Sequence, residues 1–184
     1  MAQAFKGFSR LSIFLVTANT SAAYTVGTKT AISGAVSFTK SPETSDWKIS
    51  ADDGIFDSGS DWLGEKFTLT LAQCPLELRQ YFEGGEYNTT SKVYKKFSTS
   101  QAPELAISFR VLLSDGKSQM VQIFSLKCSS FKADYKTKGE SGDISNVVIE
   151  GLIKNRVKDN QVSEEKITVT DADLTWLDTI SLPA

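Results

Sequence analysis

A mainly β fold is predicted by three features of the sequence. Apolar and polar residues alternate over several short stretches, most clearly in residues 66–72, where Phe67, Leu69 and Leu71 share one face. β-Branched and aromatic residues are common in these stretches, turn-forming residues separate them, and only one segment has a helical period. Alternation with a period of two is typical of half-buried strands. We therefore expect two packed antiparallel β-sheets, sandwich- or barrel-like, flanked by one short α-helix.

Length and composition indicate one compact domain. The chain has 184 residues, of which 40% are hydrophobic and 23% are charged, so a single domain over residues 1–184 has enough apolar material for a core. The formal net charge is −2, whereas proteins that bind nucleic acid tightly concentrate Lys and Arg. The sequence has no run of about 18 apolar residues, the length that a membrane-spanning helix needs. We expect no membrane insertion.

The predicted strands follow one another along the whole chain. The clearest hairpin joins residues 105–113 to residues 120–134 through a Ser-Asp-Gly-Lys turn. One helix of about two turns is predicted after Pro75, because apolar residues recur there at helical spacing and two glycines end the run. The strands are expected at residues 8–17, 31–39, 47–50, 66–72, 105–113, 120–134, 146–153 and 166–170.

In three segments, apolar residues do not recur with the sustained periodicity of a strand or a helix. Residues 41–65 and 84–100 are expected to be long loops, and residues 173–184 to be a C-terminal arm. Within residues 84–100, three lysines are interleaved with three aromatic residues, which is the one place where a nucleic-acid contact could be proposed. Acidic residues flank this short cluster, so a solvated loop anchored by its own aromatic residues is the preferred interpretation.

The three tryptophans of the chain fall in these irregular segments. They are Trp47, Trp62 and Trp176, and large amphipathic rings are enriched at protein–protein contacts. A single one could simply hold a loop against its own domain. Three together favour a surface that contacts other subunits.

The sequence argues against an enzyme. It contains no histidine, which removes the commonest general base and the commonest metal ligand. Asp52 and Asp53 precede a glycine, as in a turn, and the ligand spacing of an EF-hand loop is absent. We expect no catalytic residue, no cofactor and no metal site.

Two further features leave alternatives open. Residues 11–16 follow two basic residues and precede a Ser-Ala-Ala sequence, which allows a signal peptide. An ordinary strand is preferred, because the apolar run is short and contains Ser12. Cys74 and Cys128 could form a disulfide, but their apolar neighbours favour two buried thiols.

The order of these elements and several short phrases resemble the major tail tube proteins of bacteriophages with long, non-contractile tails. The resemblance extends from about Ser9 to Trp176. The resemblance rests on the ordered set of phrases rather than on any single one. The segments that carry it are Ile32–Ser37, Ser41–Glu43, Ala51–Phe56, Gly64–Ala72, the helix at Pro75, Ala102–Phe109 with the hairpin that follows, Tyr135–Lys138 and Val147–Gly151.

The resemblance implies a structural virion protein rather than an enzyme. Subunits of that family form hexameric rings that stack into a hollow tail tube, through which DNA passes transiently into the host. Its partners would be other copies of itself, a tape-measure protein in the lumen, and the tail terminator and distal tail or baseplate proteins at the ends. It would be assembled in the host cytoplasm and located in the virion tail.

The same resemblance suggests which residues contact other subunits. For ring stacking we expect Trp47, Asp52, Asp53 and Trp62 in the segment 41–65. For the C-terminal arm the expected contacts are Trp176, Leu177 and Ile180.

Three other functions stay open on sequence alone. The first is an inner tube subunit of a contractile tail or of a bacteriocin-like particle. The second is a secreted β-sandwich adhesin or binding module, which requires cleavage near Ala23. The third and least favoured is a hydrolase with a carboxylate pair.

Overall fold

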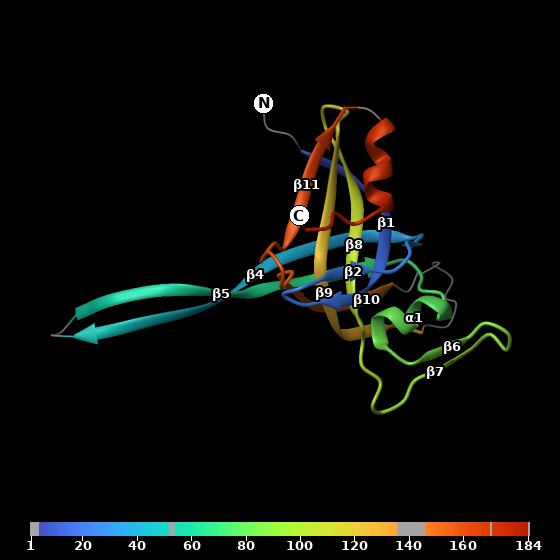
Figure 1. Ribbon diagram of the computed structural model, residues 1–184, viewed down its shortest axis with the longest axis horizontal. Helices are drawn as coiled ribbons and strands as arrows, with labels where there is room; N and C mark the ends of the chain where they lie inside the picture. Colours follow the sequence, from blue (N-terminus) through green and yellow to red (C-terminus); the bar gives the residue numbers. More distant parts are fainter. Residues whose placement is uncertain (1–3, 52–53, 136–145, 170, 184) are drawn as a thin grey trace, which may run out of the picture.

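The protein is built around one large antiparallel sheet. The computed structural model describes residues 4–51, 54–135, 146–169 and 171–183. Within these residues, nine strands form the large sheet, two short strands form a second sheet, and a short α-helix packs beside them (Figure 1). The mainly β class with antiparallel sheets and one short helix is therefore confirmed.

The strand order of the large sheet is β2-β1-β8-β9-β10-β5-β4, with β3 paired to β1 and β11 paired to β9. The small sheet contains β6 and β7. The bounds are β1 (Phe5–Asn19), β2 (Tyr24–Val26), β3 (Thr30–Ala31), β4 (Ala35–Ala51), β5 (Gly54–Leu71), α1 (Leu76–Glu83), β6 (Glu86–Asn88), β7 (Val93–Lys95), β8 (Glu104–Leu113), β9 (Ser118–Ala133), β10 (Val147–Lys154), β11 (Ser163–Thr168) and the 3₁₀ helix η1 (Asp171–Asp178).

The core lies on the sheet face that α1 covers. The helix begins after Pro75 and places Leu78 and Phe82 in the core. It ends at Gly84, whose φ is +71° and where an added Cβ would lie 2.2 Å from the carbonyl oxygen of Gln101. Glycine suits this position because other residues rarely adopt such a φ and no room exists for a side chain.

Aromatic contacts show that the large sheet curls. Phe38 on β4, at one end of the strand order, lies with its ring centroid 5.2 Å from that of Phe109 on β8, and it stacks on Phe67 of β5 at 5.9 Å. Phe109 also meets Phe8 of β1 edge-on at 5.1 Å. Strands that are distant in the sheet order therefore close around one aromatic cluster, which gives the body a barrel-like character.

Residues 11–16 belong to a central part of this fold. They lie within β1, which pairs with β8, β2 and β3. Leu11, Ile13 and Phe14 are buried. Cleavage near Ala23 would remove this strand from the sheet, so the apolar run is a core strand in this structure.

The two segments expected to be long loops contain strands. Residues 41–65 form the outer halves of β4 and β5, and residues 84–100 include β6 and β7. Within residues 41–65, the strand expected at residues 47–50 lies in β4. The rest of both strands was not predicted, because a ribbon exposed on both faces needs no alternation of apolar and polar residues.

Candidate interaction surfaces

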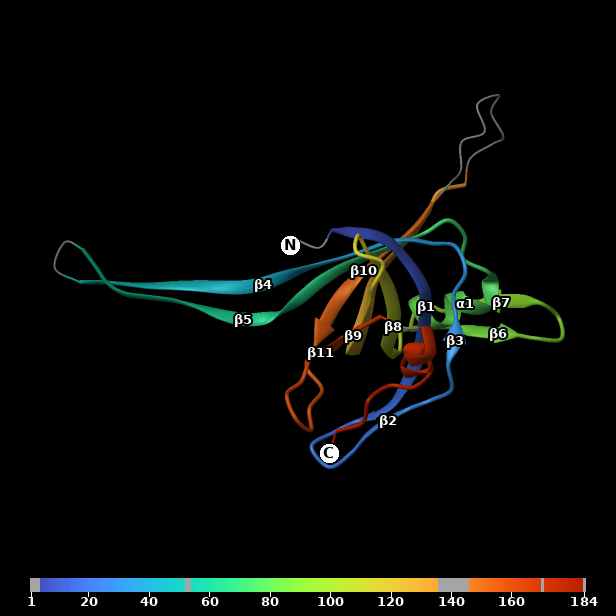
Figure 2. The ribbon, with the colours of Figure 1, turned by 90° about the horizontal axis from the view of Figure 1, so that it is seen from above.

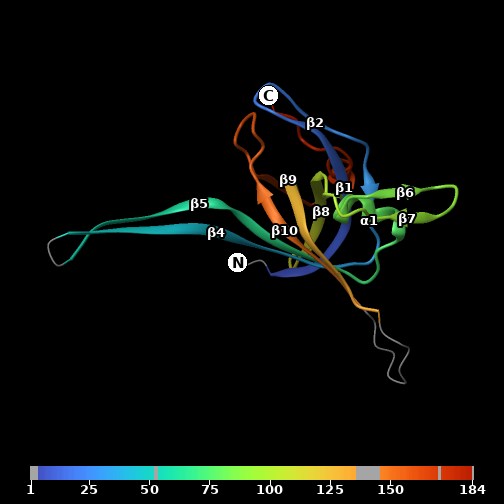
Figure 3. The same cartoon turned by 90° about the horizontal axis from the view of Figure 1, so that it is seen from below.

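A long two-stranded ribbon projects from the body. We call residues 41–65 the hairpin arm; all three overall views show it extending well beyond the rest of the molecule (Figures 1, 2 and 3). β10 pairs with β5 only from Glu65 to Leu71. Among the described residues, the outer part of β5 therefore has β4 as its only neighbouring strand. An isolated two-stranded hairpin is marginally stable in water.

The indole ring of Trp47 covers a glycine on the opposite strand of the arm. The two residues are direct partners in the β4–β5 register. A Cβ built on Gly59 would lie 2.5–2.9 Å from atoms of the indole ring. The absence of a side chain at residue 59 thus allows the ring to lie flat across the ribbon, where it remains 39% exposed.

The arm exposes an unusual amount of apolar side chain. Trp62, predicted to contact another ring, lies opposite Thr44 and is 45% exposed. Four more apolar residues of the arm are exposed that the sequence did not single out: Ile49, Ile55, Phe56 and Leu63. The predicted contact residues Asp52 and Asp53 lie outside the described residues. Contiguous exposed apolar residues mark interaction sites, so the arm is the best candidate for contact with another subunit.

An apolar groove of about 340 Å³ lies at the base of the arm. Lys40 and Glu165 are at this groove, and their charged groups lie 3.7 Å apart. Lys40 also lies 3.9 Å from Glu65. The apolar lining consists mainly of Phe5, Phe8, Val36, Phe38, Phe109 and Val111.

The predicted C-terminal arm packs on its own sheet in this structure. Leu177 and Ile180 are buried and Trp176 is half-buried. Leu177 belongs to a cluster with Met120, and Ile180 belongs to one with Phe124. Whether any of these residues also contacts another subunit stays a prediction.

Polar side chains of the sheet hold this segment in place. Gln122, which is fully buried, donates from its amide nitrogen to the carbonyl oxygens of Trp176 and Thr179, each at 2.8 Å. Its amide oxygen accepts from the backbone N–H of Ser181 at 2.8 Å. On the neighbouring strand, the hydroxyl of Ser108 donates to the carbonyl oxygen of Leu177 at 2.7 Å. Neither side chain was predicted from the sequence, because a single polar residue in an apolar strand carries no periodic signal.

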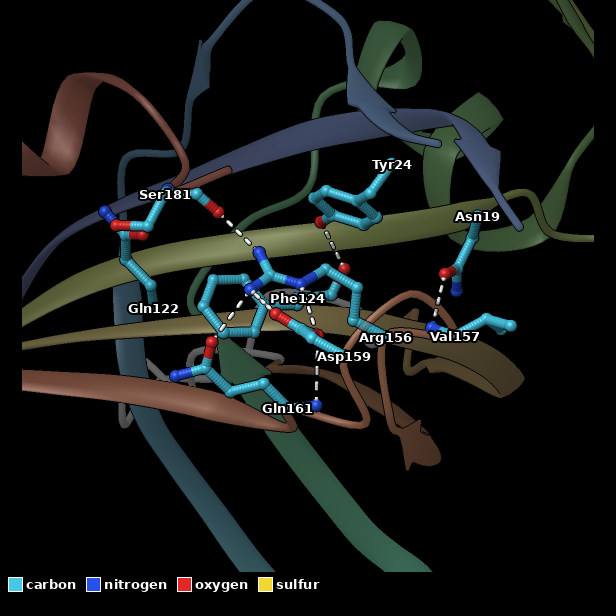
Figure 4. A network of polar contacts seen from close by, with 9 residues as sticks. All are labelled: Asn19, Tyr24, Gln122, Phe124, Arg156, Val157, Asp159, Gln161 and Ser181. Carbon is cyan, nitrogen blue, oxygen red and sulfur yellow. Dashed lines mark hydrogen bonds and ion pairs between the residues drawn. The ribbon is translucent and has the colours of Figure 1, made fainter. Parts of the chain in front are cut away.

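A buried arginine completes the attachment (Figure 4). Arg156 is 1% exposed, and its guanidinium carbon lies 4.0 Å from the ring centroid of Phe124. It donates to the carbonyl oxygen of Ser181 at 2.6 Å and pairs with both carboxylate oxygens of Asp159. The arginine lowers the pKa of Asp159. A buried charge with a partner and full hydrogen bonding is tolerated, and it fixes geometry rather than adding much stability.

The same network orders the start of β2. The hydroxyl of Tyr24 donates to the carbonyl oxygen of Phe124 at 2.6 Å, and the guanidinium of Arg156 lies 5.1 Å from the Tyr24 ring. Burial raises the pKa of Tyr24 well above its ordinary value. Because the tyrosine hydroxyl and the guanidinium are hydrogen-bonded within the protein, we interpret the network as a structural anchor.

The two cysteines are free thiols. Burial raises the pKa of Cys128 to about 12 and that of Cys74 to about 11. Reactive cysteines are thiolates at neutral pH, so neither thiol has the character of a nucleophile.

The described residues also lack two other kinds of site. In the part of the chain that the structure describes, three or more potential metal-ligating side chains never gather in one place. No helix within that same part has the length and apolarity to cross a bilayer.

Comparisons with known proteins found matches among solved structures alone. The sequence matches no model of a known protein family and no curated protein. Among solved structures, it is similar to a chain in the cap of the anti-feeding prophage, described as a tube-terminating cap, with 9% identity and a TM-score of 0.46 over 86% of this chain and 89% of that one. It is also similar to a chain in the baseplate of the anti-feeding prophage, with 8% identity and a TM-score of 0.39 over 88% of this chain and 94% of that one. At these values the likeness concerns the course of the strands alone.

Proposed function

We propose that this chain is a structural subunit of a phage-tail-like particle, whose copies form stacked hexameric rings and so build a hollow tube. The observation that carries the proposal is the hairpin arm, a ribbon that projects from the body with apolar residues exposed. A ribbon of this kind gains stability when a neighbouring subunit covers it. Contact between different surfaces of identical subunits generates rings or filaments.

The proposed role is mechanical and has no catalytic step. The arm supplies the contact between copies, while the curled sheet with its aromatic cluster supplies a rigid body. Following the family resemblance, the lumen would hold a tape-measure protein during assembly and later conduct DNA. Terminator and distal tail or baseplate proteins would bind the ends of the tube, which is assembled in the host cytoplasm and located in the virion tail.

Electron microscopy of the purified protein tests this proposal. We expect rings or tubes in negative stain after concentration and long incubation. The double substitution Trp47→Ala and Trp62→Ala should leave folded monomers, because it removes two exposed aromatic rings from the arm. Val169→Ala removes exposed apolar surface outside the arm, at a residue that is 72% exposed, and this control should assemble normally. Compact single particles of the wild-type protein under every condition would count against the proposal.

The type of particle is a separate part of the proposal. A flexible non-contractile tail and a contractile or bacteriocin-like particle share rings and a tube. A sheath protein that co-purifies with the tubes and coats them would identify the contractile form. Bare tubes in the intact particle would identify the non-contractile form.

A further inference from the structure

Negative charge is concentrated in the arm, and the rest of the chain has a net positive charge. The arm, residues 41–65, contains one lysine and seven carboxylates, so its formal net charge is −6. Because the whole chain has a net charge of −2, the remaining residues carry +4. The basic residue is Lys48, and the acidic ones are Glu43, Asp46, Asp52, Asp53, Asp57, Asp61 and Glu65.

One face of the arm combines this charge with apolar side chains. Trp47 and Ile49 lie on the same face of β4, since strand residues two apart share a face. Their cross-strand partners in β5 are Gly59 and Asp57, and Asp61 follows two residues further along the same face. Neither Asp57 nor Asp61 has an ion-pair partner among the described residues. A partner for this face needs both apolar and basic groups.

The β6–β7 hairpin offers those groups at the other end of the molecule. Figures 1 and 2 place the arm and this hairpin on opposite sides of the body. Val93 and Lys95 are exposed neighbours on β7, and Phe97 just beyond it is 50% exposed. Lys92, in the turn before β7, is exposed as well. Neither Lys92 nor Lys95 forms an ion pair within the described residues.

The opposite face of the same hairpin holds it on the body. Tyr94 donates from its hydroxyl to the carbonyl oxygen of Gly84, at the end of α1. Lys96 pairs with Glu83 of α1 at 2.5 Å. The hairpin therefore presents Lys92, Lys95 and its apolar neighbours from an anchored position.

We propose that the acidic face of the arm of one copy docks head to tail on the β6–β7 hairpin of the next copy. This inference rests on the proposed function and names the surface that receives the arm. Lys92 and Lys95 are complementary in charge to Asp57 and Asp61, and Glu86, which lies opposite Lys95 in the β6–β7 register, leaves the two lysines in excess on this hairpin. Both surfaces expose apolar side chains, and a contact between opposite ends of one molecule propagates from copy to copy. The groove at the base of the arm fits less well, because its lysine, Lys40, already lies beside Glu65 and Glu165.

Zero-length cross-linking between copies tests the contact directly. Unlabelled and ¹⁵N-labelled full-length protein are mixed, treated with a carbodiimide that joins carboxylates to lysines, and digested for mass spectrometry. We expect mixed-isotope cross-links between the arm and Lys92 or Lys95. Their yield should fall at least threefold when NaCl rises from 0.1 to 0.5 M, because salt screens exposed charges. Mixed-isotope cross-links from the arm to other lysines alone, such as Lys40 beside the groove, would overturn the inference.

Substitutions of the two lysines provide a second, independent test. Lys92→Gln with Lys95→Gln should reduce assembly, measured by sedimentation, at least fivefold. The matched control, Lys154→Gln with Lys158→Gln, removes the same charge from exposed residues elsewhere and should change assembly less than twofold. Equal loss in both double variants would refute a specific contact.

A charge exchange separates this inference from the proposed function. Asp57→Lys with Asp61→Lys should block assembly, and adding Lys92→Glu and Lys95→Glu to the same chain should restore it to within twofold. Rings or tubes that form regardless of these changes would overturn the docking contact and leave the tube standing. The expected cross-links in a protein that forms only irregular chains of copies would support the contact and overturn the tube. No association in any condition would overturn both.

Discussion

Replacing Gln122 by Met tests how the C-terminal segment is attached. Methionine has nearly the same volume and shape as glutamine, so the substitution removes the amide while leaving little cavity. Three hydrogen bonds are lost, to the backbone of Trp176, Thr179 and Ser181. Each contributes about 1 kcal/mol net, and a buried group left unpaired costs about 1–3 kcal/mol.

The environment of the freed groups sets the expected magnitude. Thr179 is exposed, while Trp176 and Ser181 are half-buried, so water reaches the freed backbone groups in part. Three bonds at about 1 kcal/mol each sum to about 3 kcal/mol, and access of water to the freed groups keeps the cost of leaving them unpaired small. We therefore expect the free energy of unfolding to fall by about 2–4 kcal/mol. That is a large fraction of the roughly 5–15 kcal/mol typical of a domain.

Urea unfolding of dilute protein, followed by tryptophan fluorescence, measures this loss. Hydrogen exchange should show faster exchange confined to residues 171–183. The control is Gln119→Met on the same strand, whose amide donates to Glu165 at the surface, and it should change stability by less than about 0.5 kcal/mol. A Gln122→Met protein as stable as the wild type, with unchanged exchange in this segment, would refute the reasoning.

Two further predictions concern close packing and the thiols. Gly151→Ala should cost about 1–3 kcal/mol or more, since the added Cβ would lie 2.2 Å from the carbonyl oxygen of Lys127, whereas Gly54→Ala has open space and should be nearly neutral in urea unfolding. An equal effect of the two substitutions would contradict the close approach of β9 and β10 at this glycine. At pH 8, iodoacetamide should label Cys74 before Cys128 by mass spectrometry, because the second thiol is more buried and has the higher pKa. Faster labelling of Cys128 than of Cys74 would count against this account. Both thiols have pKa values in the folded protein above the unfolded value of about 8.5. Their contribution to the free energy of unfolding should therefore decline as the pH rises from about 8.5 towards 12.

The sequence predicted the body of the fold well, because burial imposes a period on the body. The expected helix after Pro75 corresponds to α1, and the hairpin of residues 105–113 and 120–134 corresponds to β8 and β9 within a few residues. Each of these elements has a buried face that selects apolar residues at regular spacing. Their positions therefore follow from local patterns.

Most of the arm and all of the anchors were not predicted from the sequence, and the reasons for the two are opposite. In the arm, both faces are largely exposed, so polar, turn-forming residues occupy true strands. In the anchors, single side chains such as Gln122 and Arg156 act on segments 25–59 residues away, and no local pattern encodes such pairs. The tryptophan positions nevertheless directed attention to the arm, whose Trp47 and Trp62 the structure places on the exposed ribbon.

The strand pairings differ in the sequence separation of their partners, and this difference affects the rate at which each pairing forms. β4 and β5 follow each other in the chain and pair locally, whereas β1 must find β8 across about a hundred residues of chain. Hairpins form in microseconds, but distant pairings delay the closure of a sheet. The pairing of β4 with β5 therefore requires much less of the chain to have been synthesised than the pairing of β1 with β8. The arm's net charge of −6 makes the arms of different copies repel one another, which disfavours contact between two arms before assembly.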